Sequence, residues 1–236
     1  MINVTELKKN YSGRTVLNIP SIHIGKGESF GLVGNNGAGK TTFFRLILDL
    51  ILADKGKVQS KGKDVAKSEG WKHYTGSYLD EGFLIDYLTP EEYFHFVGKL
   101  NGLSRGDVEH FLEGFKDFFH NEIFSKKKYI RELSKGNQKK VGIAAALMTE
   151  PEILILDEPF SNLDPSSQFQ LKQILKNIQQ NNQMTMLISS HDLNHVTEVC
   201  ERIVVLHEGE IVHDLQTNEN TLKELEAYFA VKGEKE

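Results

Sequence analysis

Partial alternation of apolar and polar residues predicts strands in residues 1–60. The segment TVLNIPSIHIGKGESFGLVG shows this alternation, interrupted by turn residues at 25–27, and runs into a glycine-rich loop. Beyond the loop, apolar residues recur at the spacing of an amphipathic helix, namely Phe44, Ile47, Leu48 and Ile51. The order strand, loop, helix indicates the opening of an α/β unit.

The pattern changes to that of amphipathic, aromatic helices at about residue 90. The segment PEEYFHFVGKL places Pro90 at a first-turn position, followed by two acids that suit a helix N-terminus. The segment DVEHFLEGFKDFF continues the helical spacing. We therefore predict a helical insertion over about 90–140, with the lysine run 126–128 on a solvated face.

Short continuous apolar runs, which are typical of strands buried in a parallel sheet, return after the insertion. EILILDE and MTMLISSH are two such runs, and PSSQFQLKQILKNIQQ between them has the pattern of a helix. RIVVLHEGEIVHDL predicts a closing hairpin with Glu208 and Gly209 in its turn, and NTLKELEAYFA a final helix. The predicted fold class is α/β.

Composition narrows the class of protein. The hydrophobic share of 39% and the charged share of 26% are ordinary for a soluble globular protein, and a net charge of −5 argues against nucleic acid as a partner. A single cysteine, Cys200, excludes an internal disulfide and a thiolate metal cage. The apolar run 46–53 is too short for a membrane span and is interrupted by Asp49, and MINVTELKKNYSG lacks a secretory apolar region. We expect a cytosolic protein.

The segment GNNGAGKTT, residues 34–42, fits the phosphate-binding loop pattern G-x-x-x-x-G-K-[ST] between a strand and a helix. Glycines let backbone N–H groups turn toward an anion, Lys40 can reach the β- and γ-phosphates, and the Thr41 hydroxyl can bind Mg²⁺. The alternative is a plain glycine turn before a helix, which explains the glycines but not the whole pattern. The predicted nucleotide contacts are Gly34, Asn35, Asn36, Gly37, Ala38, Gly39, Lys40, Thr41 and Thr42.

Two adjacent carboxylates end the apolar run in ILILDEP, residues 153–159. Carboxylates at the end of a buried strand are costly unless they meet a cation or a polar substrate. Asp157 suits a Mg²⁺ position, and Glu158 can orient or deprotonate an attacking water. The alternative is that the two acids cap a helix. This would explain Asp157 on its own, but the catalytic interpretation better explains the carboxylates together with the phosphate loop.

The motifs LSKGNQKKVGIAAALM, ILILDEP, SNLD and LISSHDL resemble, in order and spacing, the ATPase subunits of ABC (ATP-binding cassette) proteins over nearly the whole chain. The resemblance implies a P-loop NTPase core with a mostly parallel sheet, an N-terminal antiparallel β subdomain and an inserted helical subdomain. It implies a single domain, with core parts at 1–89 and 141–236 and a helical subdomain at about 90–140 that carries the signature. It also implies ATP and Mg²⁺ as cofactors and a head-to-tail dimer of two cassettes, as a homodimer or a heterodimer.

The signature of the family matches Leu133–Asn137, where it contacts the γ-phosphate held by the other subunit. Ser134 is a good N-cap, Gly136 permits close backbone approach, and a helix N-terminus favours an anion. A plain helix cap would explain Ser134 alone. This sequence departs from the usual LSGGQ because Lys135 replaces a glycine and Asn137 replaces the glutamine.

Three further residues match the family by motif. His191 in LISSH matches the switch histidine at the γ-phosphate, and Asp164 in SNLDP matches the D-loop, although it could instead cap the helix after Pro165. Tyr11 in KKNYSG matches the aromatic residue that stacks on adenine, with a half-buried strand tyrosine as the alternative.

The weakest match is the Q-loop, whose place falls in GSYLDEGFLIDYLTPEEYF without a glutamine. Glu81 stands in as the candidate Mg²⁺ and water ligand, with Asp80 as the competing register.

The resemblance favours an ATP-hydrolysing subunit that works with separate transmembrane permease subunits, attached peripherally to the inner face of the cell membrane, and favours export over import. A soluble, non-transport cassette such as an iron–sulfur assembly ATPase is the alternative. A DNA-repair cassette would carry a long coiled coil between the phosphate loop and the signature. Here only 92 residues, 41 to 132, separate Lys40 from Leu133, which argues against such an insertion. A non-hydrolysing regulatory cassette conflicts with the intact Lys40, Asp157, Glu158 and His191.

Overall fold

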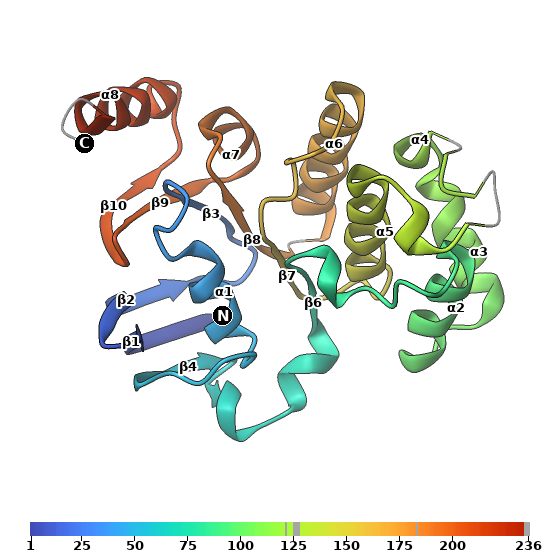
Figure 1. Cartoon of the computed structure of the whole chain (residues 1–236), viewed down its shortest axis with the longest axis horizontal. Coiled ribbons are helices and arrows are strands. Elements are labelled where there is room, and N and C mark those ends of the chain that lie inside the picture. The colour runs from blue at the N-terminus through green and yellow to red at the C-terminus, as the bar shows by residue number, and fades with distance from the viewer. Residues whose placement is uncertain (121, 125–127, 183, 234–236) are drawn as a thin grey trace.

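The computed structural model describes the chain except residues 121, 125–127, 183 and 234–236. Residues 126 and 127 of the lysine run, predicted to be solvated, lie outside the described residues. The larger of two sheets has six strands in the order β10-β9-β3-β8-β7-β6 (Figure 1). Its strands are β3 (Ser29–Val33), β6 (Thr75–Tyr78), β7 (Ile153–Leu156), β8 (Thr185–Ser190), β9 (Arg202–His207) and β10 (Glu210–Gln216).

All neighbouring strands of this sheet are parallel except β9 and β10, which form the predicted closing hairpin. The turn contains Glu208 and Gly209 with φ of 48° and 81°. Left-handed conformations at both central residues are typical of the tight turns that join antiparallel strands. The prediction of a mostly parallel sheet ended by a hairpin is confirmed.

The N-terminal part forms a second, antiparallel sheet of four strands in the order β2-β1-β4-β5. Its strands are β1 (Ile2–Tyr11), β2 (Arg14–Ile24), β4 (Lys55–Ser60) and β5 (Lys63–Asp64). In β2, exposed and buried residues partly alternate, as expected for a strand with one face on the core. The antiparallel β part of the predicted fold class is confirmed.

Eight helices accompany the sheets in the described chain. They are α1 (Lys40–Ile47), α2 (Pro90–Leu100), α3 (Arg105–Gly114), α4 (Lys116–Phe119), α5 (Lys135–Leu147), α6 (Pro165–Asn182), α7 (Leu193–Val199) and α8 (Thr221–Gly233). Pro90 begins α2 as predicted, behind a capping box between Thr89 and Glu92. In the part of the chain that the structure describes, none of these helices combines the length and the apolar character of a bilayer span.

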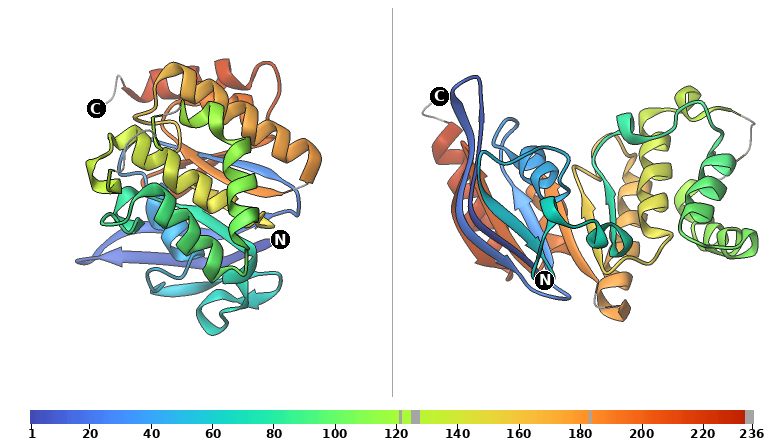
Figure 2. Two further views of the ribbon diagram at one scale, coloured as in Figure 1. Left: turned by 90° about the vertical axis from the view of Figure 1, so that its right-hand side faces the viewer. Right: turned by 90° about the horizontal axis from the view of Figure 1, so that it is seen from below.

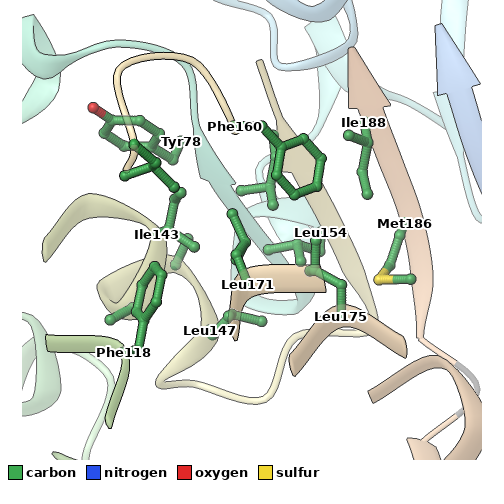
Figure 3. Packing of buried hydrophobic residues seen from close by; sticks show 14 of the residues in the cluster. Tyr78, Phe118, Ile143, Leu147, Leu154, Phe160, Leu171, Leu175, Met186 and Ile188 are labelled. Carbon is green, nitrogen blue, oxygen red and sulfur yellow. The ribbon is translucent and has the colours of Figure 1, made fainter. Parts of the chain in front are cut away.

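The larger sheet is covered on both faces along its inner strands β3, β7 and β8, which explains why these strands are continuously buried. On one face, α1 and the antiparallel sheet cover it, and residues such as Phe43, Phe44 and Ile155 share one core. On the other face, α5 and α6 pack on Leu154 and Met186 (Figure 3). Helices α2 to α4 form a lobe beyond α5 and α6, far from the antiparallel sheet (Figure 2).

Two predicted boundaries differ from the structure. The helix after the glycine loop ends at Ile47 instead of continuing to Ile51, because the chain turns at Asp49 with φ of 49°. Ile51 nevertheless packs partly against the core beneath α1. Helix α5 continues to Leu147, so the predicted limit of the helical insertion at residue 140 falls within a helix.

Gly142 on α5 lets this helix pack closely on β6. A Cβ atom at this position would lie 2.2 Å from Cδ2 and from Cε2 of the buried Tyr78 ring. We expect Gly142→Ala to lower the free energy of unfolding by about 1–3 kcal/mol because the ring must shift. Thermal melting of the two proteins measures this loss.

Gly114→Ala is the matched control, because this glycine ends α3 and a Cβ atom there would meet no other part of the described chain within 4 Å. Alanine there should leave the melting temperature unchanged or slightly higher. If Gly142→Ala melts at the temperature of the parent protein, the tight packing of α5 on Tyr78 is wrong.

Candidate functional site

The glycine-rich loop joins β3 to α1, and its backbone takes conformations that glycine adopts more readily than other residues. Gly37 and Gly39 have φ of 84° and 107°, in the left-handed region that side chains rarely adopt. A Cβ atom on Gly34 would lie 2.3 Å from the Leu206 carbonyl oxygen. Glycine is therefore required at these positions to form the loop.

The N-terminus of α1 is open to an anion. Gly39 is its N-cap and supplies no side-chain capping hydrogen bond. The first N–H groups of a helix have no partners within the helix, so those at Lys40, Thr41 and Thr42 point out of the helix end. An anionic phosphate is the group that such an end binds best.

The Lys40 side chain reaches back over this loop. Its ammonium donates a hydrogen bond of 2.6 Å to the Gly34 carbonyl oxygen and lies 3.2 Å from Oε1 of Glu158. The side chain is almost fully buried, so its charge is held in place by these oxygens. The loop therefore contains a positive charge that a phosphate can share.

Asp157 follows β7 and receives two hydroxyl donors. The Thr41 hydroxyl donates to Oδ2 at 2.5 Å, and the Ser189 hydroxyl donates to Oδ1. Burial raises the pKa of Asp157, and the hydrogen bonds from Ser189 and Thr41 lower it. Ser189 lies on β8 next to the strand that bears Asp157, and the sequence analysis did not identify it.

The pair Thr41 and Asp157 fits Mg²⁺. Mg²⁺ prefers oxygen ligands and is commonly held by one or two carboxylates together with phosphate and water oxygens. No cluster of three or more His, Cys, Asp or Glu side chains suited to a metal occurs among the residues that the structure describes. A site of this composition depends on the phosphates for its remaining ligands.

Glu158 and His191 form a second pair beside Lys40. His191 Nδ1 lies 2.8 Å from Oε2 of Glu158, and the His191 backbone N–H donates to the same oxygen at 3.3 Å. Glu158 has φ of 47°, a strained value for a residue with a long side chain. A carboxylate oriented by an imidazole can accept a proton from water.

A pocket of about 500 Å³ adjoins the phosphate loop on the side of the antiparallel sheet. Its lining residues are Arg14, Thr15, Val16, Asn35, Asn36, Gly37, Ala38, His207 and Glu208. Tyr11, predicted to stack on adenine, pairs with Arg14 across the β1–β2 hairpin and is half exposed. The pocket residues from β2, from the end of β9 and from the β9–β10 turn carried no sequence signal for nucleotide binding, because only folding brings them to the loop.

The signature segment begins α5, and Ser134 is its N-cap. The Ser134 hydroxyl accepts a hydrogen bond of 3.2 Å from the Asn137 N–H. A Cβ atom on Gly136 would lie 2.6 Å from the Asn162 carbonyl oxygen. Within the chain, this glycine therefore allows the signature helix to lie against the segment before Asp164.

Asp164 caps α6. It accepts a hydrogen bond from the Ser167 N–H at 3.0 Å and one from the Ser167 hydroxyl at 2.5 Å. These hydrogen bonds lower the pKa of Asp164 to about 2. The described chain shows no hydrogen bond or ion pair from Ser134 or Asp164 to Lys40.

The two Q-loop candidates lie at a 3₁₀ turn over Glu81–Phe83. Glu81 Oε2 lies 3.9 Å from the ammonium of Lys135, one of the departures from the usual signature. Asp80 accepts a hydrogen bond from the Gly82 N–H at 2.8 Å. In the described residues, neither carboxylate contacts Thr41 or Asp157, so the structure does not bring Glu81 into the predicted metal site.

Comparisons with known proteins agree with this site. The family model described as ABC transporter matches residues 17–161. The chain is 35% identical to the bacitracin transport ATP-binding protein BcrA of Enterococcus faecalis over 221 residues, which cover 93% of this chain and 70% of that protein. It is 33% identical to the linearmycin resistance ATP-binding protein LnrL of Bacillus subtilis over 216 residues, which cover 90% and 68% of the two chains.

A solved structure described as the ATP binding subunit of an ABC transporter has the same fold. The two superpose with a TM-score of 0.80 at 26% identity, over 96% of this chain and 93% of the other. The family match, residues 17–161, spans more than half of the chain and contains both the phosphate loop and the Asp157–Glu158 pair. The chain therefore belongs to the ABC transporter family, as one of its ATP-binding proteins.

Proposed function

We propose that this protein binds ATP with Mg²⁺ and hydrolyses it to drive transport by separate membrane subunits. The observation that carries the proposal is that five predicted residues come together at one place in two contacting groups, a hydroxyl–carboxylate pair and a carboxylate that contacts both an ammonium and an imidazole. They are Lys40, Thr41, Asp157, Glu158 and His191. These groups come from α1, the end of β7 and the end of β8.

Each group has a role that its position supports. The loop N–H groups and Lys40 bind the phosphates and stabilise the charge that develops on them. Thr41 and Asp157 would hold Mg²⁺, which supplies further neutralisation of phosphate charge. Glu158 orients the attacking water and accepts its proton, and His191 holds the Glu158 carboxylate in place. Tyr11 stacks on the adenine at the adjoining pocket.

We propose that a second copy of the chain, or a related cassette, supplies the remaining residues of each reaction centre. Among the described residues, Ser134 and Asp164 form no hydrogen bond or ion pair with Lys40 of the phosphate loop. We propose that these two residues and Gly136 complete the site of the partner in a head-to-tail dimer. An exposed helix N-terminus at α5 would face the γ-phosphate there. Glu81 is proposed to approach the metal only in that assembled state.

Export is the direction that the relatives support. One relative is named for bacitracin transport and the other for linearmycin resistance. We propose that the protein attaches to the cytoplasmic face of the cell membrane through permease subunits. Nucleic acid is not a proposed partner, because the net charge is −5.

Dilution tests the proposal that two cassettes share each site. We expect the specific ATPase activity of the purified protein to fall as its concentration is lowered, because dimers dissociate by mass action. Activity should also require Mg²⁺ and disappear when a chelator removes it. Full specific activity in a strict monomer, established by sizing at the assay concentration, would contradict the shared site.

Co-purification separates transport from the soluble alternative. Affinity capture of the protein from detergent-solubilised membranes should recover a partner with several bilayer-length apolar helices. Recovery of only soluble partners, with none of the protein in the membrane fraction, would favour a non-transport cassette such as an assembly ATPase. The ATPase assay is independent of this result.

A further inference from the structure

Lys139 on α5 is a buried lysine whose charge faces the turn after β7. Its side chain is almost fully removed from solvent. The ammonium donates hydrogen bonds to the Glu158 carbonyl oxygen at 2.7 Å and to the Ser161 hydroxyl at 2.5 Å. A charge buried in this way is costly without such partners, so its position is closely determined by the turn.

Carboxylates near Lys139 partly offset the cost of burying its charge. Burial lowers the pKa of Lys139, whereas Coulombic attraction to Glu81, Glu158 and Asp157 raises it. The printed geometry places the ammonium on the backbone of the turn, at the Glu158 carbonyl oxygen and the Ser161 hydroxyl. No other role assigned above uses this group.

The Glu158 carbonyl oxygen accepts hydrogen bonds from three donors. The Ser161 N–H donates at 3.3 Å, the Ser161 hydroxyl at 2.9 Å, and the Lys139 ammonium at 2.7 Å. Lys139 is the donor from outside the turn. Since Glu158 has φ of 47°, the turn needs surrounding contacts that hold it in this strained conformation.

The next lysine of α5 makes different contacts. The Lys140 ammonium lies 3.8 Å from Oδ2 of Asp164 and 5.8 Å from the centre of the Phe118 ring. The Lys140 ammonium therefore lies near Asp164, at the end of the segment 158–164, and not near Glu158. Contact with Glu158 is therefore a property of Lys139 and not of buried lysines on this helix in general.

We propose that Lys139 is a positioning residue that fixes the backbone of Glu158 and thereby aims its carboxylate at the attacking water. This inference rests on the proposed role of Glu158 in hydrolysis. Carboxylate and water must be aligned closely for proton transfer, and a small displacement of the turn removes that alignment. Binding of ATP depends on the phosphate loop and should be nearly independent of Lys139.

The test compares Lys139→Met, which keeps the length of the side chain but has no donor, with Lys139→Gln, which keeps N–H donors without charge. We expect Lys139→Met to lower kcat by about 10- to 100-fold, and KM for ATP to change by less than about threefold. Lys139→Gln should restore at least half of the lost rate on a logarithmic scale. Hydrogen exchange without nucleotide should be faster in Lys139→Met for the amides of Glu158 and Ser161.

Lys172→Met is the matched control, because this largely buried lysine on α6 pairs with Glu198 at 2.6 Å, away from the phosphate loop. It should change neither kcat nor the exchange of the Glu158 and Ser161 amides. If Lys139→Met does not fold, Ser161→Ala removes one partner of the ammonium and should lower kcat without changing KM. Unchanged kcat and exchange in a folded Lys139→Met protein, or equal losses in Lys172→Met, would overturn the inference.

A wild-type protein without ATPase activity would instead contradict the proposed function. The exchange measurement still tests the contact in that case, since it needs no nucleotide. Faster exchange in Lys139→Met together with absent wild-type hydrolysis would overturn the catalytic part and keep only the structural contact.

Discussion

Replacement of Glu158 by glutamine should lower kcat for ATP hydrolysis by about 10²- to 10⁴-fold. Glutamine has the shape of glutamate but cannot accept a proton from water. It can still accept the hydrogen bonds that His191 donates at 2.8 and 3.3 Å, so the site should remain in place. ATP binding should persist, and the ATP-bound dimer should accumulate because it is no longer consumed.

The measurement is the steady-state ATPase rate together with a sizing column run in ATP and Mg²⁺. Glu152→Gln is the control, because this exposed carboxylate precedes β7 and pairs with Lys61 at 2.5 Å, outside the site. It should keep the parent rate and the parent elution profile. An unchanged rate in Glu158→Gln would remove Glu158 from the role of base, whatever the sizing profile.

Lys40→Ala should weaken ATP binding by about 10- to 100-fold, since a hydrogen bond between charged groups is worth about 1.5–3 kcal/mol. The ammonium is the buried positive charge of the phosphate loop, with the Gly34 carbonyl at 2.6 Å and Glu158 at 3.2 Å. On the proposed assignment, its loss removes a phosphate ligand, and it also leaves Glu158 without its cation. Calorimetric titration with ATP measures the affinity.

Lys116→Ala is the control, because it removes a lysine that lies outside the site. Lys116 is exposed on α4 and pairs with Glu113 at 2.9 Å, so its removal should leave the affinity for ATP unchanged. A thermal melt without nucleotide shows whether Lys40→Ala still folds. A folded Lys40→Ala protein that binds ATP as the parent does would contradict the phosphate-loop assignment.

The sequence pattern predicted the features that depend only on residues close together along the chain. Glycines and Lys40 between a strand and a helix, and Asp157 and Glu158 at the end of an apolar run, could be located by reading along the chain. The hairpin turn at Glu208 and Gly209 was predicted for the same reason, because turn conformation depends on residues that are adjacent in sequence.

The sequence pattern missed two short elements and misplaced the end of one helix. Strand β6 (Thr75–Tyr78) has four residues at the edge of the larger sheet, too few for a periodic signal, and α7 (Leu193–Val199) has seven. The apolar spacing continued past the end of α1 because Ile51 also packs on the core, although it lies outside the helix. Apolar spacing reports burial, and burial is not restricted to helices.

The order of residues along the chain specifies which side chains carry chemistry and which short segments bear them: a phosphate loop, a strand ending in two carboxylates and a helix with a serine cap. Which of these groups meet depends on how the chain folds. The parallel pairing of β7 with β8 brings Ser189 to Asp157, and the packing of α5 on the turn after β7 brings Lys139 to Glu158. These contacts require atoms to approach within hydrogen-bonding distance across long stretches of chain, and sheet order and helix packing set such distances.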